Sequence, residues 1–548
     1  MTSSGPDPGD HTGGVAPEPP APPLGTGPGA PPRSTTTGPP PPAADHLAGV
    51  RVALDAGVEV AEHGRVLIGG SPTAVLRLSP AGAELVGRLA AGDPVPPGAG
   101  ATALVRRLLD RGIAHPTPRA LGAPAHLAVT VVVPTLGPLD PALVDHLARL
   151  LDAAAVEAVL VVDDASPPGR GPTAPAPVQV LTRSTNGGPA AARNSGLAQV
   201  TTPLVAFVDA DCVPGDDWPD ALLPHFVDPL VAAVAPRLVA DRAPRAASTE
   251  GARHRYDAAR GPLDLGPHPA RVRPGTRVGH VPAAFLVART EAVRALGGFD
   301  EALRVGEDVD LVWRLDLAHW TVRHEPRCLV VHRTRTRPGA WLHQRFAYGT
   351  SAGPLAQRHP GSIAPLHLPT GVAAAWLLAL RGHPLAAAGA AAAGTADLAR
   401  RLPDIDERGR TAARLTARSH ARAAQAIGSA LVRPWWPLVL VGLVASRRAR
   451  TRGVLATAVL APPLLAWARR RPALDPVRWT VLWLADDVAY GAGVWVGAWR
   501  SRTARPLLPH LTDRPWRRVS VGQPTPSRST TKTRVSPPAM APPAPRSP

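Results

Sequence analysis

The stretch that decides the fold contains three apolar runs: LAVTVVVPT (127–135), VEAVLVVDDAS (156–166) and PLVAFVDADC (203–212). Their apolar residues are continuous rather than alternating, which is typical of parallel strands buried on both faces. A shorter run, VQVLTRS (178–184), predicts a further strand, and two segments with helical character lie between the runs: PALVDHLARLLDAA (141–154) and PAAARNSGLAQV (189–200). Strands that alternate with helices predict an α/β domain with a parallel sheet, covered on both faces, over about residues 127–360.

Polar residues stand where these strands end: Thr135, Asp163-Asp164 and Asp209-Ala210-Asp211. Ligands of such sheets bind at the carboxyl ends of the strands. Asp209 and Asp211 are two residues apart on a chain leaving a strand, so they can share one divalent cation that also holds substrate phosphates. Asp163 and Asp164 can accept hydrogen bonds from a ribose hydroxyl or a base N–H, and capping a turn is the alternative.

Further motifs follow along the chain. The turn Asn186–Pro189 precedes a helix of small residues and permits close approach of a nucleotide, with Arg193 available to a phosphate or base. The run VPAAFL (281–286) predicts a strand, and GEDVDLVWR (306–314) opens a helix whose N–H groups and carboxylates surround a possible reaction centre. His332 follows a short predicted strand, either as a metal ligand beside Asp211 or as an ordinary surface histidine.

Seven motifs in this order, VVVPTL, VVDDAS, NGGPAAARNSG, VAFVDADC, GGFDE, GEDVDLVWR and the late His332, resemble the family-2 glycosyltransferases with the GT-A fold. The resemblance covers about residues 127–360. The leading unit ending GIAHP and the segment HQRFAYGTSAGPLAQRHP (343–360) are similar to the glycosyltransferases of mycofactocin biosynthesis. These enzymes decorate a redox cofactor made from a ribosomal peptide.

The resemblance implies roles for particular residues. It implies a nucleotide-sugar site made of Pro134, Thr135, Asp163, Asp164, Asn186, Gly187, Arg193, Asp209, Ala284, Trp313 and Arg314. Mn²⁺ or Mg²⁺ would be bound by Asp209, Asp211 and His332. Asp308 takes the place of the general base, in a catalytic pair with Glu307. The order Trp313-Arg314 departs from the Arg-Trp of processive synthases, which leaves long-chain polymerisation open.

The same resemblance implies a hexosyltransferase that inverts the anomeric centre in a single displacement. The implied donor is UDP-glucose or a similar nucleotide sugar, the acceptor is the peptide-derived redox cofactor, and the product is a β-linked oligosaccharide. One alternative is a glycosyltransferase of cell-wall polysaccharide or glycolipid synthesis. An alternative of another class is a non-catalytic peptide-binding scaffold. No residue distinguishes glucose from galactose.

The flanks of this domain predict separate units. Residues 49–122 predict a small winged-helix-like domain, with a hairpin or meander over 50–70 and helices over 81–92 and 101–112, and they resemble peptide-recognition domains. Residues 1–48 and 514–548 are rich in Pro with few large apolar residues, so we expect both to be disordered.

Residues 361–513 predict a helical, membrane-associated region. Its apolar runs are flanked by Arg and end in Trp, which favours a bundle at the interface of a membrane or shallowly inserted in it: 371–380, 434–445, 453–468 and 479–499. Helices of a soluble core are the alternative. No secretory signal precedes the first unit, so we expect the cytoplasmic face of the membrane.

Composition limits the remaining classes. The net charge of +18 indicates attraction to phosphates or anionic lipid, although a GC-rich coding bias also produces Arg-rich chains. Without a stacking motif, nucleic acid is not an expected partner. Cys212 and Cys328 form no CxxC pair, which excludes a disulfide framework and a structural zinc site and fits a reducing compartment. We expect both cysteines to be small buried apolar residues.

Overall fold

The structure is a computed structural model that describes residues 38–39, 42–117, 127–151, 155–241, 249–334 and 337–512. The tail expected over 514–548 lies outside these residues, as does most of 1–48. Leu47 is an exception to the predicted boundary, because it is buried in the core of the N-terminal unit.

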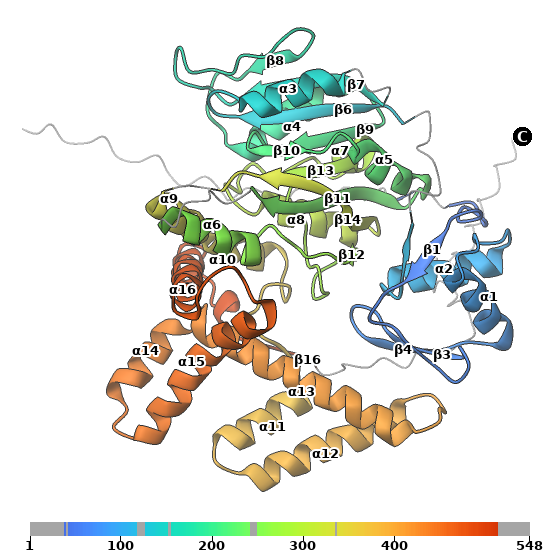
Figure 1. Cartoon of the computed structure of the whole chain (residues 1–548), viewed down its shortest axis with the longest axis vertical. Helices are drawn as coiled ribbons and strands as arrows, with labels where there is room; N and C mark the ends of the chain where they lie inside the picture. Colours follow the sequence, from blue (N-terminus) through green and yellow to red (C-terminus); the bar gives the residue numbers. More distant parts are fainter. Residues whose placement is uncertain are drawn as a thin grey trace, which may run out of the picture. The chain divides into compact units, whose positions relative to one another are not determined.

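Nine strands form one sheet in the order β10-β14-β11-β13-β9-β6-β7-β8, with β12 paired to β14 (Figure 1). One half is parallel and matches the prediction: β6 (Val129–Thr135), β7 (Val156–Asp163), β8 (Gln179–Thr182) and β9 (Leu204–Val208). The other half is mixed, and here the prediction of a parallel sheet is wrong: β10 (Cys212–Pro214), β11 (Val231–Ala240), β12 (Ala270–Val272), β13 (Phe285–Arg289) and β14 (Thr321–His332).

The reversal occurs at β13, which is antiparallel to both β9 and β11. The strand begins later than expected, at Phe285 instead of Val281. The four residues before it form a turn whose backbone bonds to other parts of the site: the Ala283 N–H donates to Asp308 and the Ala284 carbonyl accepts from the Asp209 N–H. His332 ends a strand of 12 residues and not a short one.

Helices cover both faces of the sheet, as predicted (Figure 1). Along β6, Val131 and Val133 face one apolar cluster and Val132 faces the other. This alternation explains the continuous valine run, because a strand covered on both sides buries every side chain. The covering helices are α3 (Pro141–Leu150), α4 (Pro189–Gln199), α5 (Trp218–Leu222), α7 (Thr290–Ala295) and α8 (Glu307–Leu317).

The N-terminal unit contains the expected meander and two helices. Its elements are β1 (Val52–Leu54), β2 (Glu59–Ala61), β3 (Val66–Gly69), β4 (Ala74–Arg77), α1 (Pro80–Ala90), α2 (Ala99–Asp110) and β5 (Ala114–Pro116). Ser79 caps α1 by accepting from the Gly82 N–H. Val66 and Ile68 of β3 form an apolar cluster with Leu398, Leu402 and Leu415 from the C-terminal region, so this sheet face is covered within the chain.

The C-terminal region is helical, as predicted. Its elements are α9 (Pro338–Thr350), α10 (Ala352–Arg358), α11 (Thr370–Leu380), α12 (Pro384–Arg401), α13 (Arg408–Val432), α14 (Trp436–Ala445), α15 (Ala449–Arg470) and α16 (Pro476–Arg500). The short strands β15 (His367–Pro369) and β16 (His510–Thr512) pair in parallel and join its two ends.

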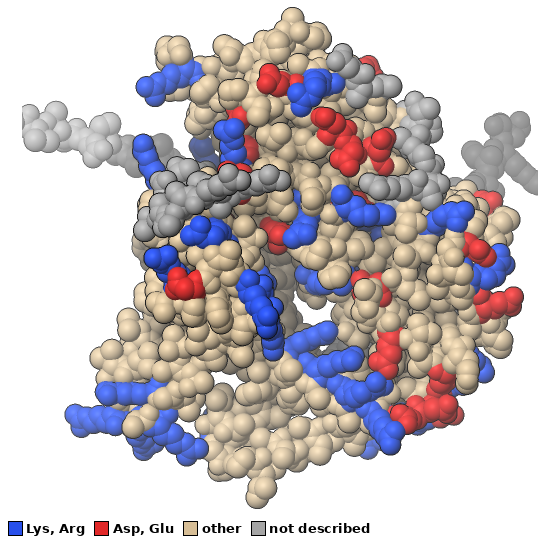
Figure 2. Space-filling model, in the orientation of Figure 1, with Lys and Arg blue, Asp and Glu red and all other residues tan. Residues whose placement is uncertain are grey.

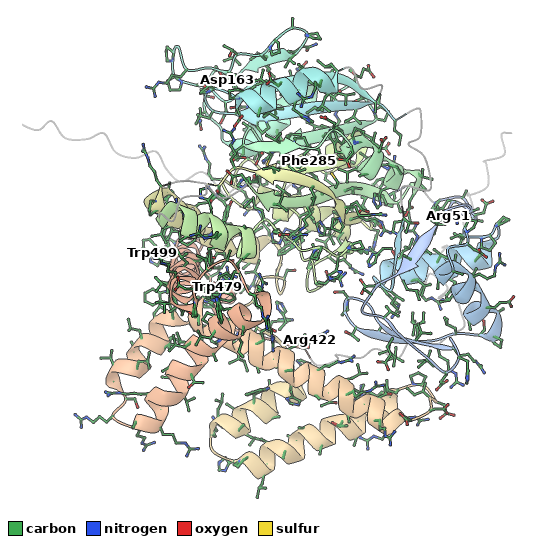
Figure 3. All side chains as sticks on the ribbon, viewed as in Figure 1. Arg51, Asp163, Phe285, Arg422, Trp479 and Trp499 are labelled. Atoms are coloured by element: carbon green, nitrogen blue, oxygen red, sulfur yellow. The ribbon has the colours of Figure 1, made fainter. Side chains whose placement is uncertain are left out.

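Helix α16 carries buried charges in the apolar run 479–499, one of the runs expected at a membrane. Asp486 and Asp487 in its middle are buried, and they pair with arginines of other helices. Asp486 accepts from Arg260 of α6 (Thr249–Arg260) at 2.7 Å and lies 3.1 Å from the Nε of Arg345 on α9. Buried carboxylates need cationic partners, in a protein interior as in a membrane. Here Arg260 and Arg345 are these partners. Figure 3 labels both ends of the run, the fully buried Trp479 and the exposed Trp499.

Glycines let α9 and α16 approach closely. A Cβ added at Gly493 would lie 2.0 Å from the carbonyl oxygen of Phe346, and one at Gly349 would lie 2.0 Å from that of Tyr490. A backbone atom cannot move aside as a side-chain end can, so only glycine fits at these positions.

Gly493→Ala should therefore lower the free energy of unfolding by about 1–3 kcal/mol, the usual cost of overpacking. Urea unfolding monitored by circular dichroism measures this. Gly389→Ala on α12 is the matched control, since a Cβ there meets nothing within 4 Å and alanine favours helix. Equal stability of the two variants would contradict the close-packing argument.

Candidate functional site

A buried arginine joins three parts of the catalytic domain. Arg193, on α4, is 3% exposed and its guanidinium lies between two carboxylates. One nitrogen is 2.6 Å from Oδ1 of Asp209, which follows β9, and another is 2.7 Å from Oε1 of Glu307, which opens α8. The guanidinium also lies over the ring of Phe299, 5.3 Å from its centroid. Arg193 thus holds the first aspartate of the Asp-Ala-Asp motif against the start of the predicted catalytic helix.

The charges in this group shift one another's pKa. Burial raises the pKa of Asp209, although Arg193 opposes the shift. Burial also raises the pKa of Glu307, with the charge of Asp308 adding to it, to about 7. Glu307 therefore changes its ionisation near neutral pH, and its negative charge is stabilised mainly by Arg193.

Asp308 has a different environment from its acidic neighbours. Helix α8 begins after Gly306, which has a left-handed φ of 86°, and carries three acidic residues in its first turn, where the helix dipole favours negative charge. Glu307 pairs with Arg193, and Asp310 pairs with Arg314 and His359. Asp308 accepts from the Ala283 N–H at 3.2 Å and, within the described part of the chain, forms no ion pair.

The candidate metal ligands Asp211 and His332 face each other across a strand pair. Cys212, next to Asp211, is in register with His332, and the His332 Nε2 is 3.5 Å from Oδ2 of Asp211. Burial lowers the pKa of His332, but the hydrogen bond and charge of Asp211 outweigh this and raise it. The Asp211 carboxylate is 50% exposed. A pocket borders His332 and is lined also by Asp257, Thr334, Gln344, Arg345 and Tyr348.

This pair fits part of a divalent metal site. A carboxylate oxygen and an imidazole nitrogen are both suitable for Mn²⁺. Among the residues that the structure describes, no group of three or more His, Cys, Asp or Glu side chains could hold a metal ion, and Oδ1 of Asp209 accepts from Arg193. A metal held by Asp211 and His332 would need further ligands from a bound diphosphate and from water.

The predicted uridine-binding aspartates hold loops in place. Asp163, labelled in Figure 3 where β7 ends, accepts from the Ser166 N–H at 3.0 Å, so the turn-capping alternative describes it. Asp164 accepts from the N–H groups of Gly187 and Gly188. The Asn186 side chain donates to the Asp164 carbonyl at 3.2 Å. The strand ends and the Asn186 turn are thus brought together, as expected from the sequence.

Of the other predicted binding residues, Pro134, Thr135 and Ala284 lie at or next to strand ends and are buried. Trp313 and Arg314 do not behave as expected. The Trp313 indole donates to the carbonyl of Gly279 at 2.7 Å, and Arg314 donates to Asp310 and to the carbonyls of Leu296 and Gly298. Their polar atoms hold loops around α8, because positions five and six residues beyond Asp308 lie on other faces of the helix than Asp308 does.

Two arginines of the site escaped the sequence analysis. Arg183 pairs with Asp164 at 2.8 Å, and Arg304 donates to the Oδ1 of Asn186 at 3.2 Å. Arg183 directly follows the strand β8, a position at the carboxyl edge of the sheet that could have marked it. Arg304 stands two residues before Gly306 and outside any motif, so no feature of the sequence indicated that it belongs to the site.

Comparison with known proteins places this geometry in a family. Residues 130–279 match the model of glycosyl transferase family 2. The chain is also 40% identical over 479 residues to the pre-mycofactocin glycosyltransferases of two Mycobacterium tuberculosis strains, CDC 1551 / Oshkosh and ATCC 25618 / H37Rv. The alignment covers 84% of this chain and 98% of each relative. The chain belongs to the pre-mycofactocin glycosyltransferase family.

It is therefore a glycosyltransferase with a GT-A-like catalytic domain, a mixed sheet and a helical C-terminal region. Among solved structures, it is similar to GalNAc-T7 with UDP, GalNAc and Mn²⁺, at 14% identity, covering 42% of this chain and 51% of that chain with a TM-score of 0.29. It is also similar to a mannosyltransferase of Pyrobaculum calidifontis with GDP-Man and Mn²⁺, at 17% identity, covering 64% and 89% with a TM-score of 0.31.

The raised pKa of Glu307 predicts a pH-dependent stability. The folded-state pKa of Glu307, about 7, lies above its ordinary value of 4.5. The folded state therefore binds the Glu307 proton more tightly than the unfolded state does. The resulting stabilisation is complete below about pH 4.5 and is lost as the pH rises through 7. Relative to Glu307→Gln, the wild type should lose roughly 1–3 kcal/mol of unfolding free energy across this range. Urea unfolding at several pH values measures it, with the exposed Glu291→Gln as control. A constant difference between wild type and Glu307→Gln would contradict the pKa shift.

Proposed function

We propose that this glycosyltransferase moves a sugar, with inversion, from a nucleotide sugar such as UDP-glucose to the peptide-derived redox cofactor precursor named in its relatives. The proposed product is a β-linked oligosaccharide. The observation that carries the mechanism is the position of Asp308. This carboxylate forms no ion pair with any residue that the structure describes, and it lies beside Glu307, which shares the buried Arg193 with Asp209. The acceptor follows from the family.

In this mechanism Asp308 takes the proton of the acceptor hydroxyl while its oxygen bonds to the anomeric carbon. The bond from that carbon to the diphosphate breaks, and the diphosphate leaves with the electron pair from the opposite face. A divalent metal, when bound, neutralises the diphosphate charge, and Asp211 and His332 are the residues that would hold it. Arg193 keeps Asp209 and Glu307 in place around the same centre.

Two alternatives are weaker. A non-catalytic scaffold needs no acidic cluster at a buried arginine, and the N-terminal sheet has one face already covered by apolar residues of the C-terminal region. A role in cell-wall polysaccharide or glycolipid synthesis uses the same catalytic groups with another acceptor. The experiment that separates these readings is mass spectrometry of the deaminated, decarboxylated peptide acceptor after incubation with the full chain, Mn²⁺ and UDP-glucose.

A ladder of added hexoses supports the proposal. Mn²⁺-dependent release of UDP without any addition to the peptide acceptor would move the acceptor to a lipid or cell-wall glycan. Neither addition nor UDP release would favour the scaffold.

Two substitutions to asparagine distinguish the role of the proposed base, Asp308, from that of the proposed metal ligand, Asp211. Asp308→Asn should leave Mn²⁺-dependent UDP binding unchanged and reduce transfer by about 10²–10⁴-fold, the usual contribution of a general base. Asp211→Asn should weaken that binding by about tenfold or more. Titration calorimetry with UDP and the mass-spectrometric assay measure the two effects. Normal transfer by Asp308→Asn would remove it as the base.

We also propose that the α14–α15 pair contacts a membrane. Helix α15 has 22 residues and is apolar enough to span a bilayer, and it packs against α14. The exposed apolar side chains are Leu438, Leu440, Val441, Val444, Val454, Leu460, Leu464 and Leu465. Arginines stand at both ends of α15 in the sequence, at 447–452 and 469–471, as at the edges of an apolar layer. Figure 2 shows basic side chains at the lower left, at the outer tip of this helix pair.

The double variant Leu440→Asp/Val444→Asp should abolish flotation of the full chain with vesicles that contain phosphatidylglycerol. Val60→Asp, at an exposed position on β2, is the matched control and should float as the wild type does. Flotation of the double variant at wild-type level would show that these helices do not bind the membrane.

A further inference from the structure

His280 lies in a segment whose backbone is hydrogen-bonded, before and after His280, to side chains of α8, one of which is the proposed base Asp308. The carbonyl of Gly279, just before it, accepts from the indole of Trp313 at 2.7 Å. Three residues after it, the Ala283 N–H donates to Asp308 at 3.2 Å. The backbone around His280 is therefore bound to α8 by a side chain on either side, and the charge of Asp308 acts on the pKa of the His280 imidazole.

The imidazole has unused hydrogen-bonding capacity. His280 is partly buried, and within the described residues neither of its ring nitrogens makes a hydrogen bond or an ion pair. Burial lowers its pKa, and Asp308 is the charged group that opposes this shift. The ring is thus neutral at neutral pH and offers one donor and one acceptor. Neither ring nitrogen is among the fully buried atoms that lack a partner, so a bound hydroxyl can reach them.

The other polar side chains near Asp308 already have partners. Glu307 pairs with Arg193, Asp310 pairs with Arg314 and His359, and the Trp313 indole bonds to Gly279. Among these side chains, within the part of the chain that the structure describes, the His280 imidazole is left without a hydrogen bond or ion pair and can bind an incoming hydroxyl.

We propose that His280 is an acceptor-binding residue, whose imidazole hydrogen-bonds the acceptor hydroxyl as Asp308 takes its proton. The inference rests on the proposed function, because it takes Asp308 as the base. The O–H bond of the acceptor breaks with its proton going to Asp308, and the oxygen forms the new bond to the anomeric carbon. His280 gains and loses no proton; it holds the hydroxyl in line for attack. The ligand class is an alcohol, such as a sugar hydroxyl.

Steady-state kinetics of His280→Ala and His280→Gln in the full chain test the proposal, with His268→Ala, at an exposed position, as control. His280→Ala should lower kcat/KM for the acceptor about tenfold or more, the effect of one lost hydrogen bond. The Kd for UDP with Mn²⁺ and the melting temperature should stay as in the wild type. His280→Gln should recover most of the activity, since an amide also donates and accepts.

Unchanged kcat/KM in His280→Ala would overturn the inference, and so would an equal loss of UDP binding or of melting temperature, which indicates a structural role. The assay uses the peptide-derived acceptor and, separately, a simple alkyl glucoside. If the wild type transfers sugar to the glucoside but not to the peptide-derived acceptor, the proposed acceptor is rejected. The role of His280 is then tested with the glucoside as acceptor. Normal transfer by Asp308→Asn would reject the base, and the role of His280 with it.

Discussion

The guanidinium of Arg193 is buried between the carboxylates of Asp209 and Glu307, and the arrangement of the site depends on this contact. A buried charge is tolerated only when it is paired and hydrogen-bonded, so the three side chains must stay together in the folded protein. They come from α4, from the end of β9 and from the start of α8. Asp308 and Asp211 are close in sequence to the two carboxylates, so the contact also positions the proposed base and a proposed metal ligand.

A second group of buried charges joins the catalytic domain to the C-terminal helices. Asp486 and Asp487 of α16 are paired with Arg260, Arg345 and Arg433. Arg345 lies on α9, which follows His332 by a short segment, and α9 packs on α16 through glycines. The end of β14, which carries His332, is thereby connected to the region whose outer helices expose apolar side chains. The proposed metal ligand His332 and the helices that we propose to contact a membrane are thus linked through buried ion pairs and close helix packing.

Much of the site could be predicted from the sequence, and what failed had a physical cause. The strand-end positions of Thr135, Asp163 and Asp209 were correct, because buried parallel strands have continuous apolar runs. The antiparallel half was missed because the composition of strands such as β11 does not depend on their direction. Trp313 and Arg314 were misassigned because a motif gives spacing along a helix but not which face packs inward.

Local sequence by itself determined that this chain has an α/β domain whose acidic strand ends meet at one edge, since that follows from the pattern of apolar runs and the residues after them. Only the tertiary structure decided which of these acids pair with arginines and which, like Asp308, forms no ion pair with the residues that the structure describes. It also decided that Asp486 and Asp487, in the run 479–499, are buried and paired with arginines. The reason is the same in both cases: the cationic partners, Arg193 for Glu307 and Arg260 for Asp486, lie more than a hundred residues away, and no local pattern encodes a pairing over that distance.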